Sequence, residues 1–173
     1  MSEDLKDIAR EVHEILYSKR KNAQQNIVRT YYDTSAVFEE PIIFVRGQDE
    51  IIRQFLFMAT IFISITAEIY SITDSMVAGN HHIVSIDALI KYRLPLKPII
   101  FRQEIELRTI TKLEFDEQNK IVKHEDIWSI KDLVETLPCV GWVYSYFGRK
   151  SVGLFTNQLV DWVQNGIRNF IEY

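Results

Sequence analysis

The chain has 173 residues, of which 47% are hydrophobic and 25% are charged, which is typical of one globular domain with a sizeable core. The net charge of −4, with both signs interspersed, gives no reason to expect nucleic acid as a partner. The single cysteine, Cys139, excludes an intramolecular disulfide and a thiolate metal site. The first residues lack the apolar region of a secretory signal, and the longest apolar run, about 55–65, is too short to span a bilayer. We therefore expect a cytoplasmic protein.

The first part of the chain indicates three helices, with a short strand and a proline turn before the third. An amphipathic helix is predicted where apolar residues recur at helical spacing, at Leu5, Ile8, Val12, Ile15 and Leu16. Asn22 is the expected cap of a second, shorter helix. A short strand over 36–38 and a turn at Pro41 follow, and a third helix is expected over 49–62. Because this third helix is apolar nearly all round, we expect other elements to wrap it.

Extended segments dominate the middle of the chain. A strand of unclear facing is expected over 66–76, and another over 81–92, whose even-numbered residues, Tyr92 among them, should face inward. After Ile130 the pattern becomes helical again, and Ser151 is the expected cap of a last helix. No repeat or linker divides the chain, so the sequence predicts a single domain.

The longest regular pattern is a β-hairpin with arms over 99–115 and 121–130, joined by a turn at 116–120. Apolar and charged residues alternate along the first arm, which is typical of a half-buried antiparallel strand. The odd-numbered residues form the inward row. This row contains three polar side chains, those of Gln103, Thr109 and Thr111.

The second arm of the hairpin has an unusual inward row. Its even-numbered residues are the more apolar ones, yet His124 and Asp126 lie in the middle of this row, followed by Trp128. Burying a carboxylate is costly unless it is hydrogen-bonded or solvated. We therefore expect this face to line a cavity, with Asp126 beside Thr109 or Thr111, depending on a register that the sequence leaves open.

Three motifs follow one another in the chain. Residues 32–41 have the pattern Y-x-x-x-A-x-F-x-x-P, residues 47–51 have G-x-x-x-I, and residues 120–128 have K-I-x-x-H-x-D-x-W. In this order they resemble the NTF2-like superfamily, which includes the SnoaL-like and ketosteroid-isomerase-like proteins. Together they cover nearly two thirds of the chain. They are specific for the fold and weak for the activity, because this fold has many functions.

The resemblance implies an α+β fold in which a cone-shaped, curved antiparallel sheet wraps around N-terminal helices, with further helices at the C-terminus. We expect one domain over 1–173, with a core over about 22–130 and a helical extension over 131–173 that resembles the extensions of fungal members. In such a cone the sheet curls around a pocket, which is the default ligand site. The expected ligand-binding residues are Tyr32, Phe38, Phe44, Tyr92, Gln103, Thr109, Thr111 and Trp128.

Asp126 and His124 are the candidate catalytic residues. Asp126 can serve as a general acid or base whose pKa is raised by an apolar pocket, or it can be a structural carboxylate satisfied by its neighbours. His124 can move a proton or orient Asp126, or it can be a satisfied core histidine. Glu39 and Glu40 either place a carboxylate at the pocket rim or form a solvated turn.

Two functions from different classes are compatible with these residues. The first is binding of a small apolar ligand, with cofactor-free acid–base chemistry such as isomerisation, dehydration or cyclisation. The second is a non-catalytic protein-binding or adaptor domain. No cofactor is expected, because nucleotide-binding glycine patterns and covalent catalytic motifs are absent from the sequence. No metal is expected either, because His81 and His82 are adjacent on a strand and point to opposite faces.

The segment 137–147 is the richest in aromatic residues, and Arg149 and Lys150 follow it. It can pack internally, form a homodimer interface or contact a membrane surface. We expect packing or dimerisation rather than contact with lipid. A homodimer through this segment or through the outer face of the sheet is therefore predicted.

Overall fold

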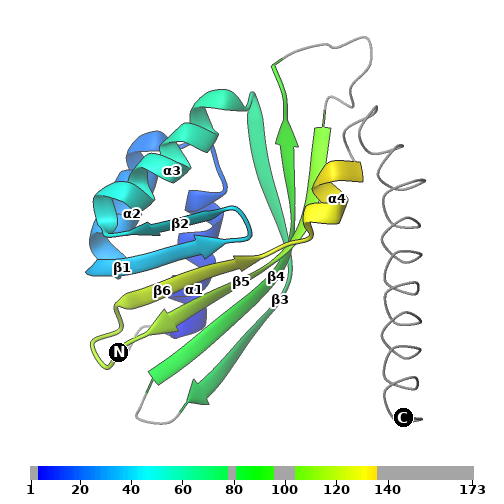
Figure 1. Ribbon diagram of the computed structural model, residues 1–173. Helices are drawn as coiled ribbons and strands as arrows, with labels where there is room; N and C mark the ends of the chain where they lie inside the picture. The colour runs from blue at the N-terminus through cyan, green and yellow to red at the C-terminus, as the bar shows by residue number, and fades with distance from the viewer. Residues whose placement is uncertain (1–3, 78–80, 96–103, 136–173) are drawn as a thin grey trace, which may run out of the picture. The chain divides into compact units, whose positions relative to one another are not determined.

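Six strands form one curved sheet, and three helices lie together on one side of it (Figure 1). The structure is a computed structural model that describes residues 4–77, 81–95 and 104–135. The helices are α1 (Leu5–Leu16), α2 (Lys21–Tyr31), α3 (Gln48–Ile61) and α4 (Ile130–Glu135). The strands are β1 (Tyr32–Glu40), β2 (Ile43–Arg46), β3 (Ser64–Val77), β4 (His81–Arg93), β5 (Glu104–Phe115) and β6 (Ile121–Ile127). The expected α+β architecture with a curved sheet is confirmed.

The strand order is β2-β1-β6-β5-β4-β3, and all neighbours are antiparallel except β1 and β6. The chain therefore returns to the first strand only after completing the long meander β3-β4-β5-β6. This return places the end of β6 beside the end of β1, with Glu39 paired to Glu125. Two segments that are far apart in the sequence thus meet in the middle of the sheet.

Almost all the described residues belong to one compact unit, Met1–Leu133. Of the second unit, Val134–Tyr173, the structure describes only Val134 and Glu135. The aromatic segment 137–147 and the helix expected after Ser151 are therefore not described, and neither is Gln103. In the part of the chain that the structure describes, no helix is long and apolar enough to cross a membrane.

The N-terminal helices follow the sequence pattern, with two corrections. Helix α2 begins at Lys21, and its cap position is Arg20 rather than Asn22, without a side-chain cap bond. Helix α3 begins after Gly47, whose φ of 89° favours glycine. The expectation that α3 is wrapped by other elements and does not lie on the surface holds for its buried side, Ile51, Ile52, Phe55 and Ala59, and fails at Phe57, which is 58% exposed. Apolar residues on this side lie at the mouth of a cavity instead of in the core.

The inward rows of the sheet are those predicted by the period of two, with one local exception. Val84, Ile86, Ala88 and Ile90 of β4 are buried, as expected for the even-numbered row. In β6 the register shifts beside Phe115, which pairs with Ile121. This shift buries Ile121, which the alternation had placed on the outer face.

Candidate functional site

A cavity of about 240 Å³ lies between the helices and the concave face of the sheet, and its wall is mostly apolar. Aromatic and aliphatic side chains of α3, β1, β4 and β5 form most of the wall, among them Phe38, Phe55, Ile90 and Leu107. The polar side chains in the wall are those of Tyr17, Glu40, Gln54, Tyr92, Thr109, Asp126 and Trp128. A concave, apolar site with a few polar groups is the usual form of a small-molecule site.

Asp126 is the centre of the polar network in this wall. Its side chain is 4% exposed. Oδ2 accepts a hydrogen bond from the Tyr17 hydroxyl, and Oδ1 accepts one from Thr111 Oγ1 at 2.6 Å and lies 3.2 Å from His124 Nε2. The Thr111 partner settles the register that the sequence left open, because Thr111 and Asp126 are directly opposite in β5 and β6.

His124 connects the network to the core. Its Nδ1 lies 2.6 Å from the hydroxyl of Tyr32. Because a carboxylate only accepts hydrogen bonds, His124 Nε2 donates to Asp126, and in the neutral ring Nδ1 then accepts from Tyr32. The ring is fully buried and lies against Phe38 and Phe55, with centroid distances of 4.9 and 5.8 Å. His124 is thus fixed in position and orients the carboxylate.

The charge state of the network follows from these contacts. Burial alone raises the pKa of Asp126, but His124, Thr111 and Tyr17 outweigh it and hold that pKa below its usual value. Of the two readings of Asp126 that the sequence left open, the one with a raised pKa does not hold, because three donors stabilise the carboxylate. Burial and the negative charge of Asp126 raise the pKa of Tyr17 and of Tyr32, so both phenols keep their protons.

His13 lies next to this network but forms no hydrogen bond with it. Its ring centroid is 4.5 Å from that of Tyr17, and the side chain is 1% exposed. Neither ring nitrogen has a partner among the described residues. Burial lowers the pKa of His13 to about 4, against the opposing charge of Asp126, so the ring is neutral at neutral pH.

Glu40 is a second carboxylate in the cavity wall. The indole Nε1 of Trp128 donates to its Oε2 at 3.1 Å. Burial raises the pKa of Glu40, the bond from Trp128 opposes this shift, and the negative charge of Asp126 adds to it. Of the two readings of 39–40, the rim carboxylate fits Glu40, while Glu39 faces outward and forms an ion pair with Lys123.

The predicted ligand-binding residues that the structure describes either line the cavity, lie behind its wall or lie away from it. Those that line the cavity are Phe38, Tyr92, Thr109 and Trp128. Tyr32 and Thr111 lie behind the wall, where they support His124 and Asp126. Phe44 does not line the cavity: it is 63% exposed, because alternation along β2 turns its neighbour Ile43 inward instead. Gln103 lies outside the described residues.

Sequence reasoning missed the contribution of α1. Tyr17 and His13 follow Ala9 at intervals of four, so they form a stripe beside the apolar stripe that predicted the helix. This spacing was the available signal.

Among the described residues no group of three or more His, Cys, Asp or Glu side chains could hold a metal ion. His82 lies 3.1 Å from Asp74, and His81 lies 3.8 Å from Glu114.

The sequence matches a known family. The family model described as the SigF NTF2-like domain matches residues 1–164. No curated protein matches the chain. The match covers most of the chain and includes all three motifs noted in the sequence.

Solved structures share the fold at low sequence identity. A protein with a ketosteroid isomerase-like fold from Catenulispora acidiphila, in complex with trimethylamine, is 14% identical with a TM-score of 0.59, over 76% of this chain and 92% of that one. An LEH-like epoxide hydrolase from M. tuberculosis is 15% identical with a TM-score of 0.58, over 83% and 93%. An NTF2-like protein of unknown function from Burkholderia pseudomallei is 12% identical with a TM-score of 0.60, over 79% and 98%.

Proposed function

This chain belongs to the SigF NTF2-like domain family, and we propose that its cavity binds a small, largely apolar molecule on which the ionised Asp126 acts as a general base. The observation that carries this proposal is the position of Asp126. Its carboxylate is ionised, buried and held by three donors, and it forms part of an apolar cavity wall. A fixed base beside a place for a ligand is the minimum that proton abstraction requires.

The geometry leaves Asp126 room to act. A carboxylate has about four lone-pair sites, and Tyr17, Thr111 and His124 occupy three of them. One site remains for a hydrogen-bond donor or an acidic proton of the ligand. Because the carboxylate is ionised at neutral pH, it serves as a base and not as an acid. Tyr17 keeps its proton and donates it to Asp126, so the hydroxyl donors in the cavity wall for an oxygen of the ligand are those of Tyr92 and Thr109.

These roles support cofactor-free chemistry. A base that takes a proton from one atom of the ligand and a network that returns it to another atom together accomplish an isomerisation. If the proton is lost together with a neighbouring hydroxyl, the result is a dehydration. In both cases His124 is a positioning residue, because it reaches the reaction only through Asp126. The lowered pKa of Asp126 weakens it as a base, which restricts it to acidic protons.

Occupation of the cavity can be tested with phenylnaphthylamine, a small uncharged fluorophore that brightens in apolar surroundings. Leu107→Trp fills the cavity and should weaken its binding at least about tenfold. Ile110→Trp makes the same kind of change on the outer face of β5, where Ile110 is 42% exposed, and should leave binding unchanged. Equal binding by both variants would place the fluorophore elsewhere and contradict the proposal.

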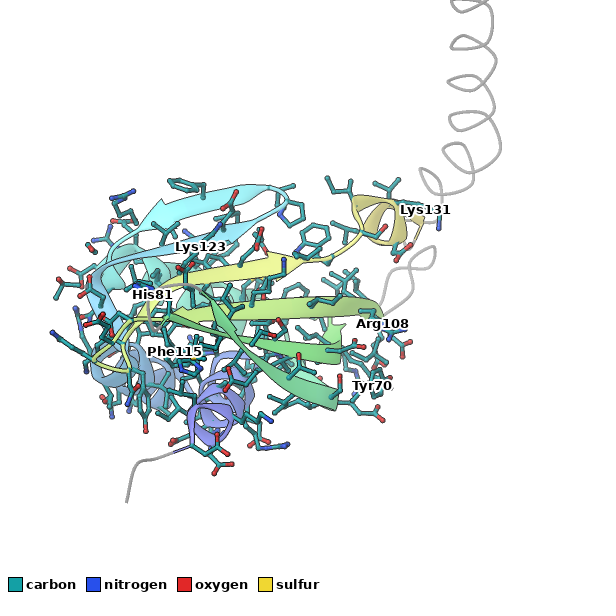
Figure 2. All side chains as sticks on the ribbon, turned by 90° about the horizontal axis from the view of Figure 1, so that it is seen from below. Tyr70, His81, Arg108, Phe115, Lys123 and Lys131 are labelled. Atoms are coloured by element: carbon teal, nitrogen blue, oxygen red, sulfur yellow. The ribbon has the colours of Figure 1, made fainter. Side chains whose placement is uncertain are left out.

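The outer face of the sheet favours a second function, association with another protein. Ile110 and Ile127 are directly paired on this face and are about two-fifths exposed, at 42% and 39%. Tyr70 of β3 is also exposed there, with Arg108 of β5 over its ring (Figure 2). Isolated apolar residues on a surface are ordinary, but a directly paired set of exposed apolar side chains such as Ile110 and Ile127 is typical of an interface.

We expect this face to support a homodimer. Sedimentation at micromolar concentration should give a species of twice the chain mass of 20.4 kDa, and Ile110→Lys should shift it to the monomer, because the substitution puts a charge into the apolar contact. Ile42→Lys is the control, since Ile42 is 65% exposed in the turn between β1 and β2. A monomer in the wild-type protein would contradict this second function.

A further inference from the structure

The charged side chains among the described residues that line the cavity are all of one sign. Glu40 and Asp126 both line it, and no Lys, Arg or His is among the described lining residues. The two carboxylates are brought together by the parallel pairing of β1 and β6. Glu39 pairs with Glu125, so the next residue on each strand, Glu40 and Asp126, faces the same side. The cavity therefore combines a negative potential with an apolar wall.

Nearby cations in the described part of the chain are engaged elsewhere. Lys19 donates to the backbone carbonyl oxygens of Ala59, at 2.6 Å, and of Phe62. Lys123 lies on the outer face of the sheet, where it pairs with Glu39 at 3.2 Å (Figure 2). Tyr17 and Thr111 are uncharged donors to Asp126, and Trp128 is an uncharged donor to Glu40. The remaining partner of Asp126 is His124, whose Nε2 lies 3.2 Å from Oδ1 and whose ring is fully buried behind the wall.

Aromatic rings form much of the remaining wall. Phe62 and Tyr92 are in contact at 4.9 Å between ring centroids, and Phe38 and Phe55 at 5.2 Å. All four line the cavity, together with Trp128. The face of an aromatic ring attracts a cation, and the attraction is strongest where water is excluded. Rings and carboxylates therefore favour the same kind of ligand.

We propose that the ligand of this cavity is an organic cation, an amine or quaternary ammonium group carried on an apolar body. This inference rests on the proposed binding function and adds the chemical class of the ligand. The cationic group lies near Glu40, at the end of β1, and the apolar body lies along the aromatic wall. The raised pKa of Glu40 agrees with this arrangement, because burial and the negative charge of Asp126 outweigh the opposing effects of Trp128 and His124, and a cationic ligand acts against both.

A matched pair of probes tests the charge preference. Benzyltrimethylammonium and neopentylbenzene have the same shape and differ in one positive charge. Both are titrated against bound phenylnaphthylamine, and we expect the cation to displace it at about tenfold lower concentration. Equal displacement by the two probes, or stronger displacement by neopentylbenzene, would overturn the proposal.

Two adjacent glutamates supply the variants. Glu40→Gln keeps an acceptor for Trp128 but removes the charge, and it should reduce the preference for the cation at least about threefold. Glu39→Gln removes one charge from the preceding residue, which faces outward. This variant should leave the preference for the cation unchanged. A preference that survives Glu40→Gln would overturn the role of Glu40.

The outcomes separate this inference from the proposed function. If phenylnaphthylamine binds but the two probes displace it equally, the cavity binds apolar molecules and the cation proposal is wrong. If phenylnaphthylamine does not bind the wild-type protein, the proposed function is contradicted. In that case calorimetric titration of benzyltrimethylammonium against the wild-type protein and Glu40→Gln decides the charge preference directly. If a variant fails to fold, the comparison of the two probes on the wild-type protein still decides whether the cavity prefers a cation.

Discussion

Acidification from pH 6.5 to about pH 4 is expected to remove about 3 kcal/mol from the free energy of unfolding because of one residue, His13. In the unfolded chain this histidine takes up a proton near its ordinary pKa of 6.5, whereas in the folded protein burial lowers its pKa to about 4. Between these values the unfolded state binds more protons than the folded state. Stability is therefore fully present above pH 6.5 and falls as the pH drops towards 4.

The surroundings of His13 explain why the folded protein resists its protonation. The side chain is 1% exposed, and neither ring nitrogen has a partner among the described residues. Asp126 favours the protonated form of His13, but burial outweighs this attraction, because the oxygens of Asp126 are already satisfied by their own donors. A proton on His13 would thus be a buried charge without a partner, which is among the most unfavourable groups in a protein interior.

The variant that tests this is His13→Met, which keeps the volume and removes the titrating group. Its stability at neutral pH should equal or exceed that of the wild-type protein, because two unpartnered nitrogens disappear. The wild-type protein should lose more stability than the variant between pH 6.5 and 4. Denaturant unfolding at several pH values measures this difference. His81→Met, at a half-exposed position in β4, is the control, and parallel curves for the wild type and His13→Met would refute the prediction.

The sheet could be predicted from the sequence because its two faces differ in polarity. In β4 and β5 the alternation gave the correct inward rows, since one face contacts the core and the other contacts solvent. The prediction failed at Ile121, where a register shift beside Phe115 changes which residues face inward. It also failed at α3, because an apolar helix does not reveal which of its residues lie at a cavity mouth. Phe57 is one of these residues.

The part of the candidate site on the sheet could be predicted from the sequence, whereas the part on α1 could not. His124, Asp126 and Trp128 share one face of one strand, so their proximity follows from the period of two. Tyr17 precedes Asp126 by 109 residues, and their contact depends on how α1 packs against the sheet. The sequence left the direction of the pKa shift of Asp126 open for the same reason. It depends on donors from three separate elements, whereas the sequence pattern showed only an apolar surrounding.

The stability of Asp126→Asn should be about 1.5 to 3 kcal/mol lower than that of the wild-type protein at neutral pH. The amide keeps the shape of the side chain but loses the charge that strengthens the bonds from Tyr17, Thr111 and His124. The direction agrees with the lowered pKa, because ionisation of Asp126 stabilises the folded state. This contribution to stability is present above the ordinary pKa of 3.8. It is lost as the pH falls through the lower pKa that Asp126 has in the folded protein. It therefore lies at lower pH than the loss caused by His13.

Ligand binding by the same variant separates a structural carboxylate from one that meets the ligand. Phenylnaphthylamine has one N–H group, and its N-methylated form has none. If Asp126 accepts a hydrogen bond from the ligand, Asp126→Asn should weaken the parent compound about threefold or more and leave the methylated compound nearly unchanged. Glu125→Gln is the matched control, because Glu125 is the preceding residue of β6 and pairs with Lys112 on the outer face. A destabilised Asp126→Asn protein that binds both compounds as the wild type does would make Asp126 a structural residue and remove its role as a base.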